Sequence, residues 1–182
     1  MRHALFAAVL GSALSPFAAS ALELTSPDIT AGGNIPDEQV FSGFGCTGGN
    51  ISPTLKWSGA PAGTKSFALS IYDPDAPTGS GFWHWVMVDI PADVTELSKN
   101  AGDPKAGKAP AGVIQSGTDF GSKGYGGPCP SKGDTPHHYH FMLFAVDTPK
   151  LGTDADTTAA VVGFYLHSHT LAKAELVAVY GH

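Results

Sequence analysis

The stretch HHYHFMLFAVD, residues 137–147, decides the fold class of this 182-residue chain. Its aromatic and apolar residues are typical of a β-strand. Alternation with a period of two puts four side chains on one face and three on the other: His137, Tyr139, Phe141 and Leu143, opposite His138, His140 and Met142. Both faces are largely apolar beyond the first residues, so we expect this strand to lie inside a layered structure.

Further strands are predicted elsewhere along the chain. Residues 65–73 (KSFALSIYD) alternate with Phe67, Leu69, Ile71 and Asp73 on one face. In residues 82–90 (FWHWVMVDI) the same rule groups Phe82, His84, Val86 and Val88. Shorter strands are expected at residues 22–25, 55–57 and 175–180. Glycine, proline, asparagine and aspartate punctuate the segments between them, which indicates a β-rich protein.

Two segments do not have the pattern of strands. Residues 99–125 are rich in glycine, lysine, alanine and serine and are expected to form an extended surface loop. Near the C-terminus a helix is predicted from a cap at Asp154 or Asp156 to about Ala172. The side chains that carry the helical spacing are Val161, Val162, Tyr165, Leu166 and His169. No repeat or linker divides the chain, so we expect one domain over residues 22–182.

The N-terminus has the pattern of a secretory signal peptide over residues 1–21. A short basic start precedes an apolar run that is too short to span a bilayer, and Ala19-Ser20-Ala21 supplies the cleavage site. We therefore expect a periplasmic or secreted protein. Cleavage near Ala21 removes the only arginine, Arg2, so the formal net charge changes from −6 to −7. Such an acidic chain is not expected to bind nucleic acid or an anionic membrane surface.

Cys46 and Cys129 are the only cysteines. An even count in an exported chain favours a disulfide. Closing so long a loop would stabilise the fold by on the order of 4–5 kcal/mol. Two buried free thiols are the alternative, and the spacing excludes a catalytic CxxC pair.

Polar side chains gather at the predicted strand ends. DPDAP (73–77) closes one strand, His84 lies near the start of the next, and GGPCP (126–130) precedes the strand that begins with His137. Carboxylates and imidazoles beside a rigid Gly-Pro wall predict the mouth of a small polar pocket. A purely structural role is the alternative, because DPDAP is also a good turn sequence and a single histidine in an apolar strand is commonly a core residue.

These stretches resemble the phosphatidylethanolamine-binding protein family, which includes the Raf kinase inhibitor proteins, and in particular its small bacterial branch. The matching segments follow one another along nearly all of the mature chain: FGCTGGNISPTLKWSGAP (44–61), DPDAP (73–77), HWVMVDIP (84–91), GGPCP (126–130), HHYHFMLFAVD (137–147) and HTLAKAELVAVYG (169–181). The resemblance implies a mainly β fold, an antiparallel β-sandwich with one or two peripheral helices near the C-terminus. It also implies a small pocket for anionic groups such as phosphate, phosphorylated headgroups or acetate.

Carried over position by position, the pocket residues are Asp73, Asp75, His84, Gly127, Pro128, His137 and Tyr139. The two imidazoles, the Gly127 N–H and the Tyr139 hydroxyl are donors that suit an anion. The two aspartates would repel an anion, so we expect them to accept hydrogen bonds from imidazoles or backbone groups and to orient them. His138 replaces the arginine that is common in the family, on the face opposite His137, and should affect the outer surface more than the pocket.

The resemblance also implies that the disulfide between Cys46 and Cys129 anchors the FGCTGGN loop to the pocket rim. It allows a homodimer, although no sequence stripe defines an interface. The net charge of the mature chain argues against stable membrane association.

Three functions remain open at this point. The first is a non-enzymatic binding protein for a small anion, and the second is an inhibitor of a kinase or protease, with a protein partner. The third is an enzyme, because two aspartates and two histidines superficially suit a metal site or acid–base catalysis. We expect the first, with no cofactor and no metal. Strand alternation separates His137 from His138 and His140, and the chain has no GxSxG, SxxK or P-loop motif.

Overall fold

Strands dominate the part of the chain that the computed structural model describes, residues 21–182. The predicted signal peptide lies outside these residues, except for Ala21. The elements in chain order are β1 Glu23–Thr25, β2 Ser42–Gly43, β3 Cys46–Thr47, β4 Leu55–Ser58, β5 Ser66–Asp73, β6 Phe82–Pro91, β7 Glu96–Leu97, β8 Ile114–Gln115, β9 His137–Val146, α1 Ala159–His169 and β10 Thr170–Tyr180. This confirms the mainly β fold, with one helix near the C-terminus.

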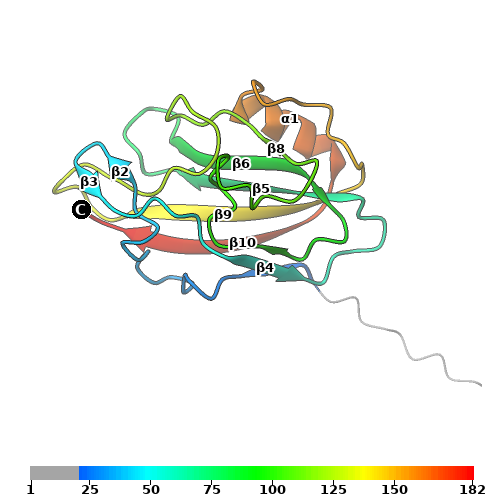
Figure 1. The fold of residues 1–182 in the computed structure, drawn as a ribbon, viewed down its shortest axis with the longest axis horizontal. Helices are drawn as coiled ribbons and strands as arrows, with labels where there is room; N and C mark the ends of the chain where they lie inside the picture. The colour runs from blue at the N-terminus through cyan, green and yellow to red at the C-terminus, as the bar shows by residue number, and fades with distance from the viewer. Residues whose placement is uncertain (1–20) are drawn as a thin grey trace, which may run out of the picture.

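The strands form one large and two small antiparallel sheets (Figure 1). The large sheet has the order β10-β9-β5-β6-β8, the second sheet has the order β1-β4-β7, and β2 pairs with β3. Strand β9 is hydrogen-bonded to β10 on one edge and to β5 on the other. The stretch that predicted the fold therefore lies in the interior of the large sheet, as expected.

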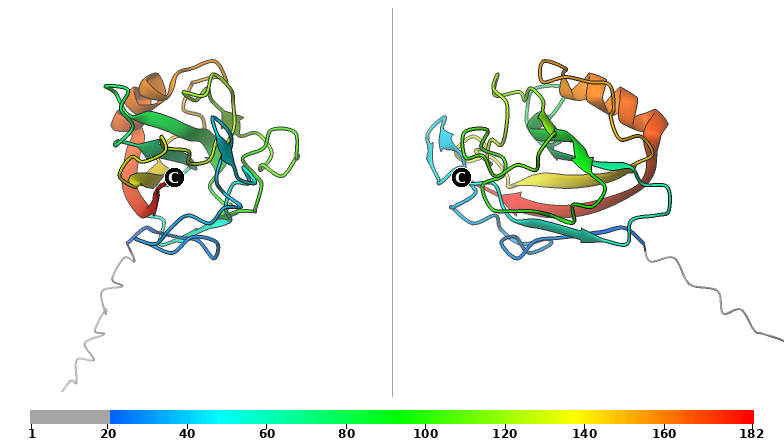
Figure 2. Two further views of the ribbon diagram at one scale, coloured as in Figure 1. Left: turned by 90° about the vertical axis from the view of Figure 1, so that its left-hand side faces the viewer. Right: turned by 45° about the vertical axis from the view of Figure 1, so that its right-hand side comes forward.

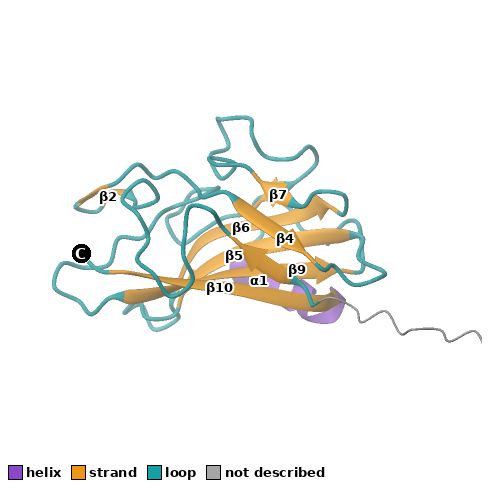
Figure 3. Cartoon of the chain, turned by 90° about the horizontal axis from the view of Figure 1, so that it is seen from below, coloured by secondary structure: helices purple, strands orange, loops and turns teal. Residues whose placement is uncertain are grey.

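Two hydrophobic clusters lie on opposite faces of the large sheet. The larger cluster joins it to the three-stranded sheet, for example where the rings of Trp57 and Phe67 meet with centroids 5.4 Å apart. The smaller cluster lies under α1, where Val162 and Leu166 pack on Val86 and its neighbours. The helix and the N-terminal strands accordingly cover opposite sides of the long strands (Figures 2 and 3). This layering is the predicted β-sandwich with a peripheral helix.

Strands β5 and β9 follow the predicted alternation. Their inward side chains belong to the larger cluster, except for the polar residues at the strand ends, which are also buried. The inward residues are Phe67, Leu69, Ile71 and Asp73 in β5, and His137, Tyr139, Phe141 and Leu143 in β9.

Strand β6 departs from the prediction at His84. Ile71 pairs with Trp85 and Tyr72 pairs with Trp83, so His84 is an extra residue that forms a β-bulge. Val86 and Val88 belong to the cluster under α1, whereas the His84 ring contacts Tyr139 on the opposite face, with centroids 5.1 Å apart. The prediction that Phe82, His84, Val86 and Val88 share a face is therefore wrong, because the bulge shifts the alternation by one residue.

The helix is shorter than predicted at both ends. Its N-cap is Thr158, whose hydroxyl accepts from the Val161 N–H, and not Asp154 or Asp156. The Asp154 carboxylate instead accepts from the Asp156 N–H and the Thr157 hydroxyl, which closes a turn before the helix. At the other end, residues 170–172 belong to β10. The extended φ and ψ of Thr170 end the helix three residues earlier than its apolar spacing predicted.

Residues 99–125 are mostly loop, as expected, but they do not lie wholly on the surface. Ile114–Gln115 forms β8, which pairs with β6 at one edge of the large sheet. Ala101, Ser116 and Tyr125 are buried. The Tyr125 hydroxyl donates to the Gln39 carbonyl at 2.7 Å, and so this segment contributes to the packing behind the pocket described below.

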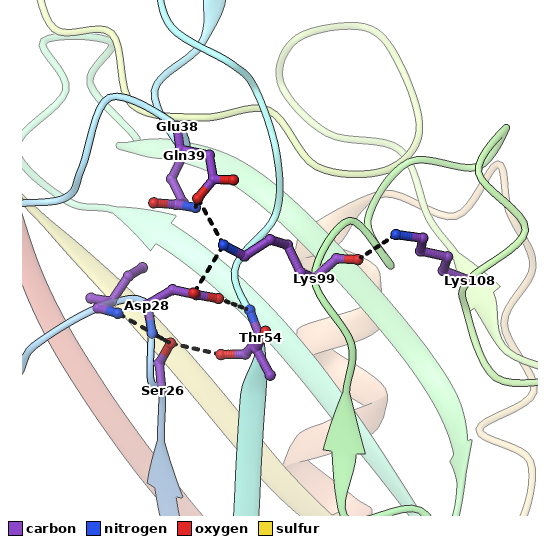
Figure 4. A network of polar contacts seen from close by, with 8 residues as sticks. Ser26, Asp28, Glu38, Gln39, Thr54, Lys99 and Lys108 are labelled. Atoms are coloured by element: carbon purple, nitrogen blue, oxygen red, sulfur yellow. Dashed lines mark hydrogen bonds and ion pairs between the residues drawn. The ribbon is translucent and has the colours of Figure 1, made fainter.

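A lysine joins three segments on the side of the molecule that carries the N-terminal strand (Figure 4). The Lys99 ammonium lies 3.0 Å from the Asp28 carboxylate and 2.8 Å from the Glu38 carboxylate. Burial acts to raise the pKa of Asp28, but hydrogen bonds from Thr54 and Lys99 lower it below its ordinary value. The Glu38 carbonyl also accepts from the Ile51 N–H, and so Lys99 helps to fix the base of the segment that carries β2 and β3.

Candidate functional site

Three strand ends meet around a small cavity at one end of the large sheet. Strand β5 ends at Asp73, and the antiparallel strands on either side of it, β6 and β9, begin at Phe82 and His137. The cavity has a volume of about 150 Å³. Its lining residues are Phe44, Asp73, Ala76, Pro77, Thr78, Phe82, His84, Phe120, Cys129, Pro130, Ser131, His137 and Tyr139. Four of the seven predicted pocket residues are therefore together: Asp73, His84, His137 and Tyr139.

Asp73 orients His137. The Asp73 Oδ2 atom lies 2.7 Å from the His137 Nδ1 atom, and both side chains are buried. The Oδ1 atom accepts from the backbone N–H groups of Asp75 and Ala76 at 2.9 and 3.1 Å. A carboxylate can only accept, so Nδ1 of His137 carries a proton and Nε2 is the nitrogen left for a ligand. This is the orienting role that we expected for Asp73.

His84 is held in the same manner by a backbone carbonyl. Its Nδ1 atom lies 2.8 Å from the Gly126 oxygen, which can only accept, so Nδ1 again carries a proton. Its Nε2 atom is buried and has no hydrogen-bond partner within residues 21–182. Burial, the largest effect, lowers the pKa of His84, although Gly126 and the Asp73 charge act to raise it. The ring is therefore held neutral, with a bare acceptor nitrogen.

Tyr139 places a hydroxyl-bearing ring between the two histidines. Its ring centroid lies 5.1 Å from that of His84 and 6.5 Å from that of His137. Burial, followed by the nearby Asp73 charge, raises the pKa of the phenol. The hydroxyl therefore stays protonated and remains available as a donor.

Phe120 forms a wall of the cavity that the sequence did not predict. Asp119 fixes its position, because the Asp119 carboxylate accepts from the Trp83 N–H at 2.8 Å and the Asp119 N–H donates to the Trp83 carbonyl at 3.1 Å. A side-chain carbon at Gly126 would collide with the Phe120 ring, so the close packing here requires glycine. An isolated phenylalanine in a polar loop gives no sequence signal for such a position.

The predicted disulfide joins Cys46 to Cys129. It ties the β2–β3 hairpin to the segment that leads into β9, and both Cys129 and the hairpin residue Phe44 line the cavity. The expectation that this bond anchors the FGCTGGN loop to the pocket rim is confirmed. Phe44 itself was inside the quoted motif but was not predicted as a site residue.

Gly127 and Pro128 lie behind the cavity wall and do not line it. The Gly127 N–H, predicted as a donor to an anion, donates to the Asn50 side chain at 2.8 Å. A side-chain carbon at Gly127 would collide with the Gln39 carbonyl. The Pro128 carbonyl accepts from the Phe41 N–H at 3.0 Å. Both residues therefore support the wall through backbone packing.

Asp75 also lies outside the cavity lining. Its carboxylate accepts from the backbone N–H and from Nδ1 of His138, both at 2.8 Å. These hydrogen bonds lower the pKa of Asp75. Asp75 thus accepts from an imidazole, as expected, but the imidazole is that of His138 on the outer surface.

The described residues bring three side chains of metal-ligand type together at one place, Cys46, Cys129 and His182. Both sulfur atoms there are bonded to one another in the disulfide. In the cavity, Asp73 and the two histidine Nδ1 atoms are engaged in hydrogen bonds with protein groups. The arrangement is that of a pocket with two imidazoles whose Nδ1 atoms are held by protein acceptors, and with a protonated phenol.

Known proteins share this fold and sequence. The model of the phosphatidylethanolamine-binding protein family matches residues 25–181. UPF0098 protein YbcL of Escherichia coli (strain K12) is 52% identical over 162 residues, which cover 89% of this chain and 88% of that protein. UPF0098 protein YbhB of the same organism is 46% identical over 159 residues, which cover 87% of this chain and 99% of that protein.

A solved structure agrees with the sequence matches. The crystal structure of E. coli YbcL has a TM-score of 0.87 and 50% sequence identity to this chain, and the match covers 90% of this chain and 99% of that chain. YbcL is described with that structure as a new member of the mammalian PEBP family. The chain therefore belongs to the phosphatidylethanolamine-binding protein family.

Proposed function

We propose that this protein is a non-enzymatic binding protein that takes a small oxyanion into the cavity between His84, His137 and Tyr139. The ligand is a phosphate-like group, a phosphorylated headgroup or a carboxylate. One observation carries the proposal: two imidazoles of one cavity have their Nδ1 atoms bonded to protein acceptors, and the Nε2 of His84 is buried without a partner. A buried polar atom without a partner costs free energy, and a bound ligand would satisfy it.

The fixed tautomers mean that the anion binds together with a proton. In the neutral rings both Nε2 atoms are acceptors, which repel an anion oxygen. A proton on Nε2, or on the ligand itself, converts the contact into a hydrogen bond. Asp73 adds a negative charge behind His137, so a singly charged, protonated ligand fits better than a dianion.

Several groups around the cavity argue against catalysis. The Thr78 hydroxyl donates to the Gly81 carbonyl, and Cys129 is held in the disulfide. Ser131 is the remaining nucleophilic hydroxyl in the lining of the cavity. Activation by a general base requires a hydrogen bond from the nucleophile to that base. Within residues 21–182, no hydrogen bond joins Ser131 to either histidine.

The proposal includes action outside the cytoplasm, because the first 21 residues have the pattern of a signal peptide. Within residues 21–182, no helix is long and apolar enough to cross a membrane. N-terminal sequencing of protein isolated from a periplasmic fraction tests this part. A chain that begins at Leu22 supports export, and one that retains Met1 contradicts it.

Calorimetric titration with sulfate and phosphate at pH 5.5 and 8 tests the pocket. Sulfate carries no proton in this range, so it must bind together with a proton taken up from solution, and its affinity should fall steeply from pH 5.5 to 8. Phosphate should bind better than sulfate at pH 8, because phosphate still carries an O–H donor at this pH and sulfate does not. Buffers with different ionisation enthalpies should reveal the uptake of about one proton per sulfate bound.

Two variants separate the site from the rest of the molecule. His84→Ala should abolish the pH-dependent binding, and His167→Ala, in α1, is the matched control that should leave it unchanged. Equal sulfate affinity at both pH values, or intact anion binding in a folded His84→Ala variant, would refute the proposal.

A further inference from the structure

The disulfide between Cys46 and Cys129 borders two cavities. Cys129 lines the cavity described above, whereas Cys46 lines a neighbouring cavity together with His182. One potential ligand atom from each of these three residues lies within 4.8 Å of the other two. Two sulfur atoms and an imidazole nitrogen at such distances have the composition of a binding site for a thiophilic metal ion.

The His182 imidazole lies at the distance from Cys46 that a shared metal ion requires. The Nδ1 atom of His182 is 3.7 Å from the Sγ atom of Cys46. Zinc bonds of about 2.3 Å to sulfur and about 2.0 Å to nitrogen, at a tetrahedral angle, separate the two ligand atoms by roughly 3.5 Å. The His182 carbonyl accepts from the Gly133 N–H at 3.2 Å, and this hydrogen bond fixes the backbone of the histidine beside the disulfide.

Reduction of the disulfide frees both sulfur atoms for a metal ion. A dithiol reductant transfers two electrons and two protons to the disulfide and leaves as a disulfide itself, so that Cys46 and Cys129 become thiols. A divalent metal ion then displaces the two thiol protons. Two thiolates on one zinc ion are separated by roughly 3.8 Å. Side-chain rotation can reach this separation without a large movement of the backbone, because the two Cα atoms are 6.0 Å apart.

The surroundings of the cluster suit a cation. Asp37 and Tyr180 line the same cavity as His182. Burial, followed by the Asp37 charge, raises the pKa of Tyr180, so a negative charge acts on this cavity. Cys46 is buried and His182 is exposed, so an ion can reach the cluster from the His182 side. Soft sulfur donors favour Zn²⁺ over hard ions such as Ca²⁺ and Mg²⁺.

We propose that the reduced protein binds one Zn²⁺ ion through Cys46, Cys129 and His182, with water in the fourth position. The ion and the disulfide compete for the same two sulfur atoms, so the oxidised protein does not bind Zn²⁺ at this place. The ion takes over from the disulfide as the link between the β2–β3 hairpin and the segment that leads into β9. The inference goes beyond the proposed function, because neither His84 nor His137 is a ligand.

Titration with Co²⁺, a coloured substitute for Zn²⁺, tests this inference on the untagged protein. The protein is reduced with dithiothreitol, which is then removed by gel filtration under nitrogen. Bonds from Co²⁺ to thiolates give charge-transfer absorption, and tetrahedral coordination gives intense bands in the visible range. We expect both signals to saturate at about one Co²⁺ per chain and to disappear when Zn²⁺ is added. The oxidised protein should show neither signal.

Two variants separate a folded three-ligand site from binding by two thiols alone. His182→Ala should weaken Zn²⁺ binding to the reduced protein by at least about tenfold, because the loss of a ligand costs no less than the loss of an outer-shell partner. Competition with a chromophoric chelator measures this affinity. His167→Ala, in α1, is the matched control and should leave the affinity unchanged. Zn²⁺ should also raise the urea midpoint of the reduced wild type, because the complete site exists only in the folded chain.

Three results would overturn the inference. The first is a reduced protein that takes up no Co²⁺, and the second is a reduced His182→Ala variant that binds Zn²⁺ as tightly as the wild type does. The third is a urea midpoint of the reduced wild type that Zn²⁺ leaves unchanged. Sulfate binding is measured on the oxidised protein, so a failure of the metal site leaves the proposed function standing, and the converse also holds.

Discussion

Replacing Asp73 by asparagine should strengthen anion binding at alkaline pH. In the wild type, the Asp73 carboxylate accepts from Nδ1 of His137 at 2.7 Å and leaves Nε2 of the neutral ring as an acceptor. In Asp73→Asn, the amide oxygen can keep the hydrogen bonds from the Asp75 and Ala76 N–H groups. The amide nitrogen then faces His137, and the ring changes to the tautomer that carries its proton on Nε2. This nitrogen can donate to an anion without taking up a proton.

The geometry gives the size of the electrostatic part of this effect. Two hydrogen bonds and the width of an imidazole ring place the Asp73 carboxylate roughly 7 Å from an anion oxygen at Nε2. At an effective dielectric constant of about 20, repulsion over this distance is about 2 kcal/mol, or roughly thirtyfold in affinity. The variant should lose on the order of 1–2 kcal/mol of folding stability, because a charge-assisted hydrogen bond becomes a neutral one.

Titration with sulfate at pH 8 measures the gain, and circular dichroism confirms that the variant is folded. Asp75→Asn is the control, because Asp75 bonds to His138 outside the cavity and should change the affinity much less. The reasoning is refuted if folded Asp73→Asn binds sulfate at pH 8 no better than the wild type does, or if both variants gain equally.

Three further predictions concern stability and packing. Replacing Cys46 and Cys129 by alanine opens a crosslink between positions 83 apart and should cost about 4.5 kcal/mol on the loop-entropy model; a loss below 1 kcal/mol in urea unfolding would contradict it. Gly126→Ala should displace the Phe120 ring and weaken phosphate binding. Adding Phe120→Ala should recover stability, because it removes the ring that clashes with the new side-chain carbon. A double variant less stable than Gly126→Ala would contradict this. Thr158→Ala should lower the unfolding free energy by about 1 kcal/mol through the loss of the helix cap, whereas an unchanged urea midpoint would show that the cap contributes nothing.

Periodicity predicted most of the fold because the long strands are buried on both faces or alternate regularly. It failed where local geometry changes the period. The bulge at His84 inserts a residue that no pattern in FWHWVMVDI reveals, and it moves the histidine to the face opposite Val86. The sequence predicted the helix start too early, because Asp154, Asp156 and Thr158 are all residue types that favour an N-cap. Which of them caps the helix depends on the turn that the Asp154 carboxylate closes.

The cavity was predictable only in part, for a physical reason. Asp73, His84, His137 and Tyr139 lie on strands whose ends the sequence located, so their meeting followed from the antiparallel order. The sequence predicted that the Gly127 N–H donates to the ligand, but this N–H donates to the Asn50 side chain, 77 positions away in the chain. The residues around Gly127 in the sequence do not indicate this partner. The aromatic wall depends on how residues 99–125 fold back over β6, and loop composition does not determine that path.

The bulge in β6 also bears on how the two sides of this strand can change during evolution. On one side of the sheet, Val86 and Val88 pack in the hydrophobic cluster under α1. On the other side, His84 lines the cavity. A substitution under the helix therefore leaves the His84 imidazole in place, and a substitution in the cavity leaves the packing of α1 on the sheet unchanged. Relatives can thus diverge in the molecule they bind while they conserve the helix packing, and the helix surface can acquire new contacts without altering the ligand.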